Sequence, residues 1–188
     1  DQYLLKHQGQ AYVELVDTGS TQLHFRRSPE YLGRIFAPYM PDAESVFIEN
    51  LSHQNIEGVM RDGALIIEPF EITRRALFWE DYIQRYPRSS YLQDAKNILA
   101  HYQTLLFIGT QTTPVSDNYT DRHSVAISTW EEIEKLSRLE NSALAQQAKK
   151  FLNFYDMNEA QRENALGLQK GQKPEQQLTV YLGIPKIS

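Results

Sequence analysis

The 188-residue sequence contains no cysteine. This absence excludes disulfide bonds, thiolate metal ligands and a cysteine nucleophile. Long apolar runs are missing as well, because no stretch approaches the ~18 residues that a membrane-spanning helix requires, and no signal-peptide core is present. A chain of this length can nonetheless bury a hydrophobic core large enough to fold without disulfide bonds or bound metal.

Clusters of positive charge are equally scarce. The formal net charge is -5, and the basic doublets Arg26-Arg27, Arg74-Arg75 and Lys149-Lys150 belong to no longer basic run. Because binding to a phosphate backbone needs clustered Lys and Arg, we expect no nucleic-acid partner. The 5 histidines are scattered, and no phosphate-cradling glycine loop occurs, so we expect no metal site and no cofactor.

The hydrophobic pattern changes character near residue 72. Residues 1–72 mix strand-like and helical patterns and predict a small α+β portion. Two β-prone runs, 11–16 and 22–25, flank Asp17-Thr18-Gly19-Ser20 and predict a hairpin. The apolar run 64–67 follows an Asp-Gly turn and predicts a buried strand that Pro69 ends.

From Thr73 onward the apolar spacing is helical. It predicts one helix from a Thr73 cap to Pro87 and a second from about residue 91 to Gly109, joined by a turn short enough to make the pair antiparallel. After a polar loop, Ser128 and Glu131 match a capping box that opens a third helix. A fourth helix follows Asn141-Ser142, and a short one ends near Gly167. The predicted fold is therefore mostly α, with tandem antiparallel helix pairs over residues 73–168.

The last segment, residues 169–188, predicts a linker followed by a strand. Gln, Lys, Gly and Pro dominate positions 169–177, whereas residues 178–184 are β-prone. Because a lone exposed strand promotes aggregation, we expect this strand to return to the N-terminal sheet.

An internal repeat supports the helix pairs. At a constant offset of 53 residues, the matching positions are Ser89 with Ser142, Ala95 with Ala148, Lys96 with Lys149, Ile98 with Phe151 and Leu99 with Leu152. The small alanines would let neighbouring helices approach closely, while Trp79 and Trp130 would fill the space between paired helices.

The first predicted helix pair carries the motif Trp79-x-x-Tyr82-Ile83-x-x-Tyr86-Pro87-x-Ser89-x-Tyr91-x-x-Asp94-Ala95. This motif resembles the repeat signature of tetratricopeptide-type proteins of the bacterial cell envelope, such as outer-membrane assembly lipoproteins and cell-division coordinator proteins. Over residues 73–155 the resemblance implies an exported, often lipid-anchored helical scaffold that binds peptides or other envelope proteins.

The chain departs from that family pattern in two places. Leu139-Glu140-Asn141-Ser142 replaces the proline turn in the second unit, and the offset of 53 exceeds the usual ~34 residues. The chain also begins with Asp1 rather than the cysteine that lipidation requires. We therefore expect membrane association only through an anchor that precedes Asp1.

The candidate binding residues are Trp79, Tyr82, Arg85, Tyr86 and Arg88. Aromatic residues at helical spacing belong mostly to a core. The hydroxyls of Tyr82 and Tyr86 are nonetheless suited to the rim of a groove, and nearby arginines complete the composition of peptide-binding anchors. The sequence thus predicts a non-catalytic scaffold with a protein or peptide partner, located in the cell envelope outside the cytoplasm.

Two alternatives remain open. One is an extracellular ligand-sensing domain of a membrane protein, which the missing initial Met and the mixed N-terminal segment favour. The other is a homodimeric aspartic protease, since Asp17-Thr18-Gly19 resembles the turn in which two aspartates share a proton. The chain has no second such motif, so Asp17 would need a second copy to supply the other carboxylate. Asp-Thr-Gly-Ser is also ordinary hairpin-turn chemistry.

Overall fold

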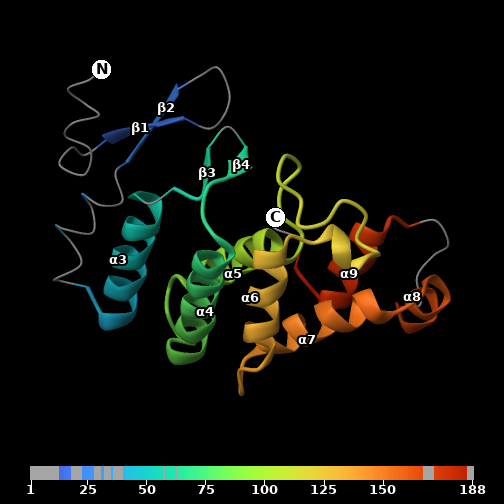
Figure 1. Cartoon of the computed structure of the whole chain (residues 1–188). Helices are drawn as coiled ribbons and strands as arrows, with labels where there is room; N and C mark the ends of the chain where they lie inside the picture. The colour runs from blue at the N-terminus through green and yellow to red at the C-terminus, as the bar shows by residue number, and fades with distance from the viewer. Residues whose placement is uncertain are drawn as a thin grey trace.

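Helices make up most of this computed structural model, which describes residues 13–17, 23–27, 31, 35, 40–56, 58–61, 63–166 and 172–185. The elements in chain order are β1 (Val13–Asp17), β2 (Leu23–Arg27), α3 (Asp42–Ile56), β3 (Met60–Arg61), β4 (Ala64–Leu65), α4 (Pro69–Arg85), α5 (Leu92–Phe107), the 3-10 helix η2 (Arg122–Ser124), α6 (Ile127–Ser137), α7 (Ala143–Asp156), α8 (Glu159–Leu166) and α9 (Pro174–Leu182). The helices α3, α4 and α6 stand in a row (Figure 1). The predicted fold class, mostly α with a smaller α+β N-terminal part, is confirmed.

Two short hairpins precede the helix pairs. β1 and β2 are antiparallel, with Asp17 opposite Leu23, as the sequence predicts. β3 and β4 form the second hairpin, in which Gly63 adopts a φ of 80° that favours glycine. The buried strand predicted over residues 64–67 is only partly correct. The β3–β4 ladder ends at Leu65. The Ile66 N–H still donates to the carbonyl of Val59 at 3.0 Å, but the Ile66 side chain is 49% exposed.

The first helix pair is α4 and α5. Helix α4 begins at Pro69, earlier than the predicted Thr73 cap, after an extended Glu68. The first position of a helix tolerates proline because its N–H would have no partner there. Pro69, which the sequence predicts to end a strand, is therefore the first residue of this helix. The end of α4 before Pro87 and the antiparallel return of α5 are as predicted.

The second pair is α6 and α7. Helix α6 begins at Ile127 after an extended Ala126 and has no side-chain cap, so the predicted Ser128–Glu131 capping box is wrong. Ser128 already lies in the first turn. Helix α7 does have a cap, since the Ser142 hydroxyl accepts a hydrogen bond from the backbone N–H of Ala145 at 3.1 Å.

One core joins the helix pairs to α3. The alanines of the repeat, Ala95 and Ala148, are fully buried, as their small size led us to expect. Phe47 of α3 stacks on Tyr91 with ring centroids 4.4 Å apart and meets Trp79 edge-on at 5.3 Å. The core therefore continues across residue 72, where the sequence places the division between the N-terminal portion and the helical domain.

A buried carboxylate links the two pairs. Glu80 of α4 accepts a hydrogen bond from the Ser142 hydroxyl at 2.7 Å and another from the backbone N–H of Leu144 at 2.8 Å. Its negative charge thus lies at the positive end of α7, where a carboxylate is stabilised. The contact fixes α7 against α4.

The C-terminal strand predicted over residues 178–184 is wrong, because this segment forms helix α9. Leu178 and Leu182, four residues apart, are buried on the face that packs against α7, while Val180 is 58% exposed. Burial of this helical stripe outweighs the β-propensity of the segment. Gly183, with a φ of 65°, ends the helix. Within the described residues, no helix combines the length and apolarity needed to cross a bilayer.

Candidate functional site

The structure buries the two predicted anchors Trp79 and Tyr82 beneath α3. The Trp79 indole N–H donates to Oε1 of Gln54 at 2.9 Å, and the ring is 0% exposed. The Tyr82 hydroxyl donates to the carbonyl of Ala43 at 2.8 Å and shares a hydrogen bond with Ser89 Oγ at 2.7 Å. Burial raises the pKa of Tyr82 above its usual value. While α3 is docked, neither ring is available to a partner.

The other predicted binding residues lie at the turn between α4 and α5. Arg85 is exposed and pairs with Asp81 at 2.9 Å. Tyr86 is half-buried, with its ring 5.1 Å from that of Tyr82, and Arg88 is exposed. These residues remain accessible, but the rings expected to anchor a peptide beside them belong to the core.

The proposed protease turn is described only at its first residue. Asp17 is the last residue of β1, and Thr18 and Gly19 lie outside the described residues. Elsewhere in the described part of the chain, no group of His, Asp and Glu side chains is placed to hold a metal ion.

Sequence reasoning missed an apolar pocket between the two helix pairs. It encloses about 190 Å³ where β4, the start of α4, the end of α5 and the start of α6 meet. The lining residues are Leu65, Ile67, Pro69, Ile72, Leu105, Leu106, Thr113, Pro114, Val115, Ala126, Ser128 and Thr129. The lining offers hydroxyl groups but no carboxylate, imidazole or ammonium group. This pocket can therefore bind an apolar group, but its lining cannot act as a general acid or base.

A tight turn after α5 shapes one wall of the pocket. Gly109 has a φ of 87°, and a Cβ there would collide with the carbonyl oxygen of Thr113. The backbone N–H of Val115 returns to the carbonyl of Ile108 at 2.9 Å. Thr113 Oγ1 also accepts from the N–H of Leu65 at 3.2 Å, which ties the loop to β4. The pocket is thus closed by contacts between segments far apart in the sequence.

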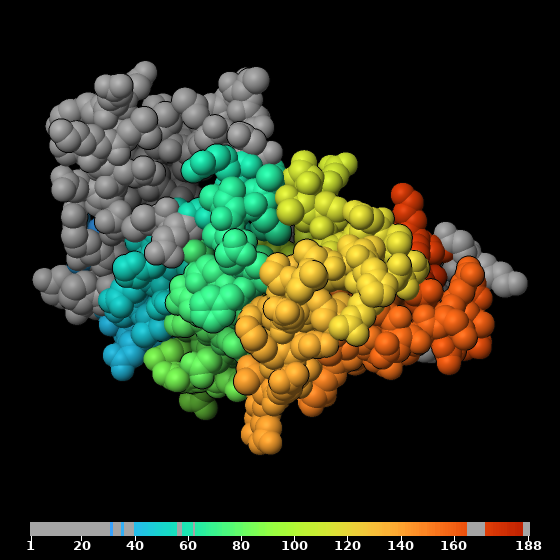
Figure 2. Space-filling view, viewed as in Figure 1, coloured from blue at the N-terminus to red at the C-terminus, as the bar shows by residue number. Residues whose placement is uncertain are grey.

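Three exposed apolar side chains adjoin the lining residues, and we call them the apolar rim. They are Ile66, Phe70 and Ile127, which are 49%, 63% and 77% exposed. Each is a chain neighbour of a residue that lines the pocket. The segments that carry them meet near the centre of the face shown in Figure 2. Large apolar groups gathered beside a concave surface are typical of interaction sites.

The start of α4 beside the pocket is held by charge pairing. Nε of Arg74 donates to Glu71 Oε2 at 2.7 Å, and Nε of Arg75 donates to Oε1 at the same distance. The hydrogen bond from Arg74, with a further contribution from Arg75, lowers the pKa of Glu71 from 4.5 to about 2. Glu71 therefore stays ionised near neutral pH and fixes the first turn of α4.

Comparison of the chain with models of known protein families, with curated proteins and with solved structures found no match. The pocket and its rim are therefore assigned from their own geometry.

Proposed function

We propose that this chain is a non-catalytic helical scaffold that binds a protein or peptide partner through the pocket and the apolar rim. The observation that carries the proposal is the exposure of Ile66, Phe70 and Ile127, each of which is the chain neighbour of a residue that lines one pocket. Burying such a side chain fully contributes about 1.5–3 kcal/mol. A partner that covers the rim gains this free energy without rearranging the core.

The size of the pocket supports a side chain as the bound group. Sites for drug-sized molecules and cofactors usually enclose ~300–1,000 Å³. The pocket here encloses about 190 Å³. An aromatic or branched apolar side chain of a partner is the kind of group that suits this space, with Phe70 and Ile127 packed around it.

Peptide selection against the immobilised protein tests the proposal. We expect enriched peptides to share a large apolar residue, and Phe70→Asp or Ile127→Asp to weaken their binding at least about tenfold, in proportion to the apolar area lost. Val180→Asp and Leu139→Asp are matched controls, because both residues are exposed apolar side chains outside the pocket lining. The proposed function would be rejected if rim and control variants lost peptide binding equally, or if selection enriched no peptides with a large apolar residue.

The location we propose is the cell envelope, outside the cytoplasm. Its support is the resemblance of the segment from Trp79 to Ala95 to envelope repeat proteins. Protease digestion of intact and osmotically opened cells, detected with an antibody to this chain, tests it. Cleavage after the outer barrier alone is opened is expected, and full protection until the inner membrane is broken would contradict it.

A further inference from the structure

The carboxylate of Glu68 borders the apolar pocket at the start of α4. Glu68 lies between Ile67 and Pro69, which both line the pocket. Its side chain is exposed and forms no ion pair with another described residue. Phe70 of the apolar rim follows two residues later. A partner that covers Phe70 therefore meets a negative charge beside it.

A second carboxylate lies on the exposed face of α6. Glu131 follows Ile127 of the apolar rim by four residues and Ser128, which lines the pocket, by three. Residues at these spacings are neighbours on one face of a helix, with Cβ atoms about 5–6 Å apart. Glu131 is exposed and, like Glu68, belongs to no ion pair among the described residues. A group bound over Ile127 is thus within reach of this carboxylate.

The positive charges at the start of α4 are held by groups of the protein itself. Arg74 donates two hydrogen bonds to the carboxylate of Glu71, at 2.7 and 2.6 Å. Arg75 is buried, and it donates to Glu71 at 2.7 Å and to the carbonyl of Gln54 at 3.3 Å. The exposed pair of Arg74 with Glu71 is therefore neutral and does not offset Glu68.

The cations near the start of α6 are paired in the same way. Lys135 lies 3.6 Å from Glu132, and Arg122 lies 3.9 Å from Glu134. Arg61 of β3 is exposed, so it adds one positive charge against the two carboxylates. In the described segments that carry the pocket lining and the apolar rim, negative charge is therefore in excess.

We propose, building on the function proposed above, that the partner segment carries lysine or arginine on both sides of its apolar anchor, so that these cations meet Glu68 and Glu131. Charges complementary to those around an apolar contact speed association and select the partner. A second copy of this chain fits the surface poorly, because a two-fold contact places the same patch, and so the same carboxylates, against itself.

Four end-blocked peptides test the inference. Three have a central Phe whose flanking residues are all Lys, all Gln or all Glu, and the fourth has Ser in place of Phe between the Lys residues. The wild-type protein should bind the Lys-flanked Phe peptide at least about tenfold more tightly than the Glu-flanked one, with the Gln-flanked one between them. Added salt should narrow this difference, because it screens exposed charges. The Ser peptide should bind at least about tenfold more weakly than its Phe counterpart.

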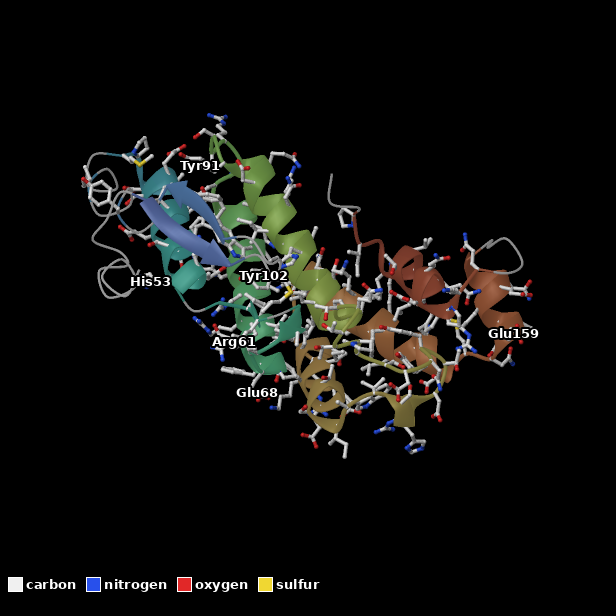
Figure 3. The ribbon with its side chains drawn as sticks, turned by 90° about the horizontal axis from the view of Figure 1, so that it is seen from above. His53, Arg61, Glu68, Tyr91, Tyr102 and Glu159 are labelled. Atoms are coloured by element: carbon white, nitrogen blue, oxygen red, sulfur yellow. The ribbon has the colours of Figure 1, made fainter. Side chains whose placement is uncertain are left out.

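Variants that remove one carboxylate locate the contact. Glu68→Gln and Glu131→Gln should each weaken binding of the Lys-flanked Phe peptide about twofold to fivefold, and the double variant should bind the three Phe peptides within about threefold of each other. Glu159→Gln is the matched control, because it removes an exposed carboxylate from α8. Figure 3 shows Glu159 at one end of the molecule, well away from Glu68. This control should leave the preference for Lys unchanged.

Failure of the inference and failure of the proposed function give different results. If the three Phe peptides bind equally well and Phe70→Asp weakens the Gln-flanked one, the function stands and the basic partner is rejected. Tightest binding of the Glu-flanked peptide, or a preference for Lys that Glu159→Gln lowers as much as Glu68→Gln does, would also overturn the inference. If no peptide binds, or if Phe70→Asp leaves the Gln-flanked peptide bound as before, both are rejected. A dimer in sedimentation experiments that Phe70→Asp dissociates would assign the rim to a second copy and overturn the inference.

Discussion

At the scale of single residues, Gln54 holds α3 to both helices of the first pair. Its Oε1 accepts hydrogen bonds from the Trp79 indole and the Tyr102 hydroxyl, each at 2.9 Å. Gln54→Leu would leave two donors unpaired and should lower the free energy of unfolding by about 2–4 kcal/mol in urea titrations. Gln54→Glu keeps an oxygen that can accept both hydrogen bonds and is the control. If Gln54→Leu changed the free energy of unfolding by less than about 0.5 kcal/mol, Gln54 would not be what holds α3 to the first helix pair.

Glu71 should make stability depend on pH in the acid range. Its pKa is lowered from 4.5 to about 2 in the folded chain, first by Arg74 and then by Arg75. The stabilisation is therefore complete above pH 4.5 and disappears as pH falls toward 2. At neutral pH the free energy of unfolding of the wild type should exceed that of Glu71→Gln by about 1–3 kcal/mol. This difference should disappear as the pH falls to about 2. A gap that stays constant from pH 7 to 2 would mean that these arginines do not hold Glu71 ionised.

At the scale of elements, α9 offers a direct test of helix against strand. In a strand, residues 178, 180 and 182 would share one face, whereas in a helix Val180 turns away from Leu178 and Leu182. In denaturant titrations, Leu178→Ala should lower the free energy of unfolding by about 2–5 kcal/mol and Val180→Ala by less than about 0.5 kcal/mol. Comparable losses for both substitutions would favour the strand that the sequence suggested.

The elements that the sequence predicts best are those with a long apolar stripe and a clear stop. Helices α4 and α5 end close to Pro87 and Gly109 as predicted, because proline and left-handed glycine act locally. Helix starts are less well predicted, since the N-cap residues of α4 and α6 are Glu68 and Ala126, whereas the sequence predicts Thr73 and Ser128. Helix α9 was mispredicted because its buried stripe is defined by contact with α7, which local propensity does not encode.

At the scale of the whole molecule, α3 belongs to the same core as the helix pairs. Phe47 contacts the rings of Trp79, Tyr82 and Tyr91. Phe47→Ala should lower the free energy of unfolding by about 3–5 kcal/mol and keep a single transition in calorimetry and fluorescence. Two separate transitions, of which only the earlier one shifts, would show that α3 melts independently of the helix pairs.

The candidate site could not be read from the sequence. Its lining comes from residues 65–72, 105–115 and 126–129, and their meeting depends on long-range contacts such as that of Thr113 with Leu65. The aromatic stripe was visible, but nothing local shows that α3 covers Trp79 and Tyr82. The apolar run 64–67 predicts that Ile66 is buried in a strand, and no feature of the sequence indicates that its side chain is exposed.

Hydrogen–deuterium exchange with a selected peptide tests the partner-binding site most directly. Bound peptide should slow exchange of backbone amides in segments 64–72, 110–116 and 126–130, which surround the pocket, and leave α8 unchanged. Phe70→Asp should abolish the slowing at the same peptide concentration. Slowing confined to α3 or to the turn at Arg85 and Arg88, with these segments unaffected, would contradict the assignment.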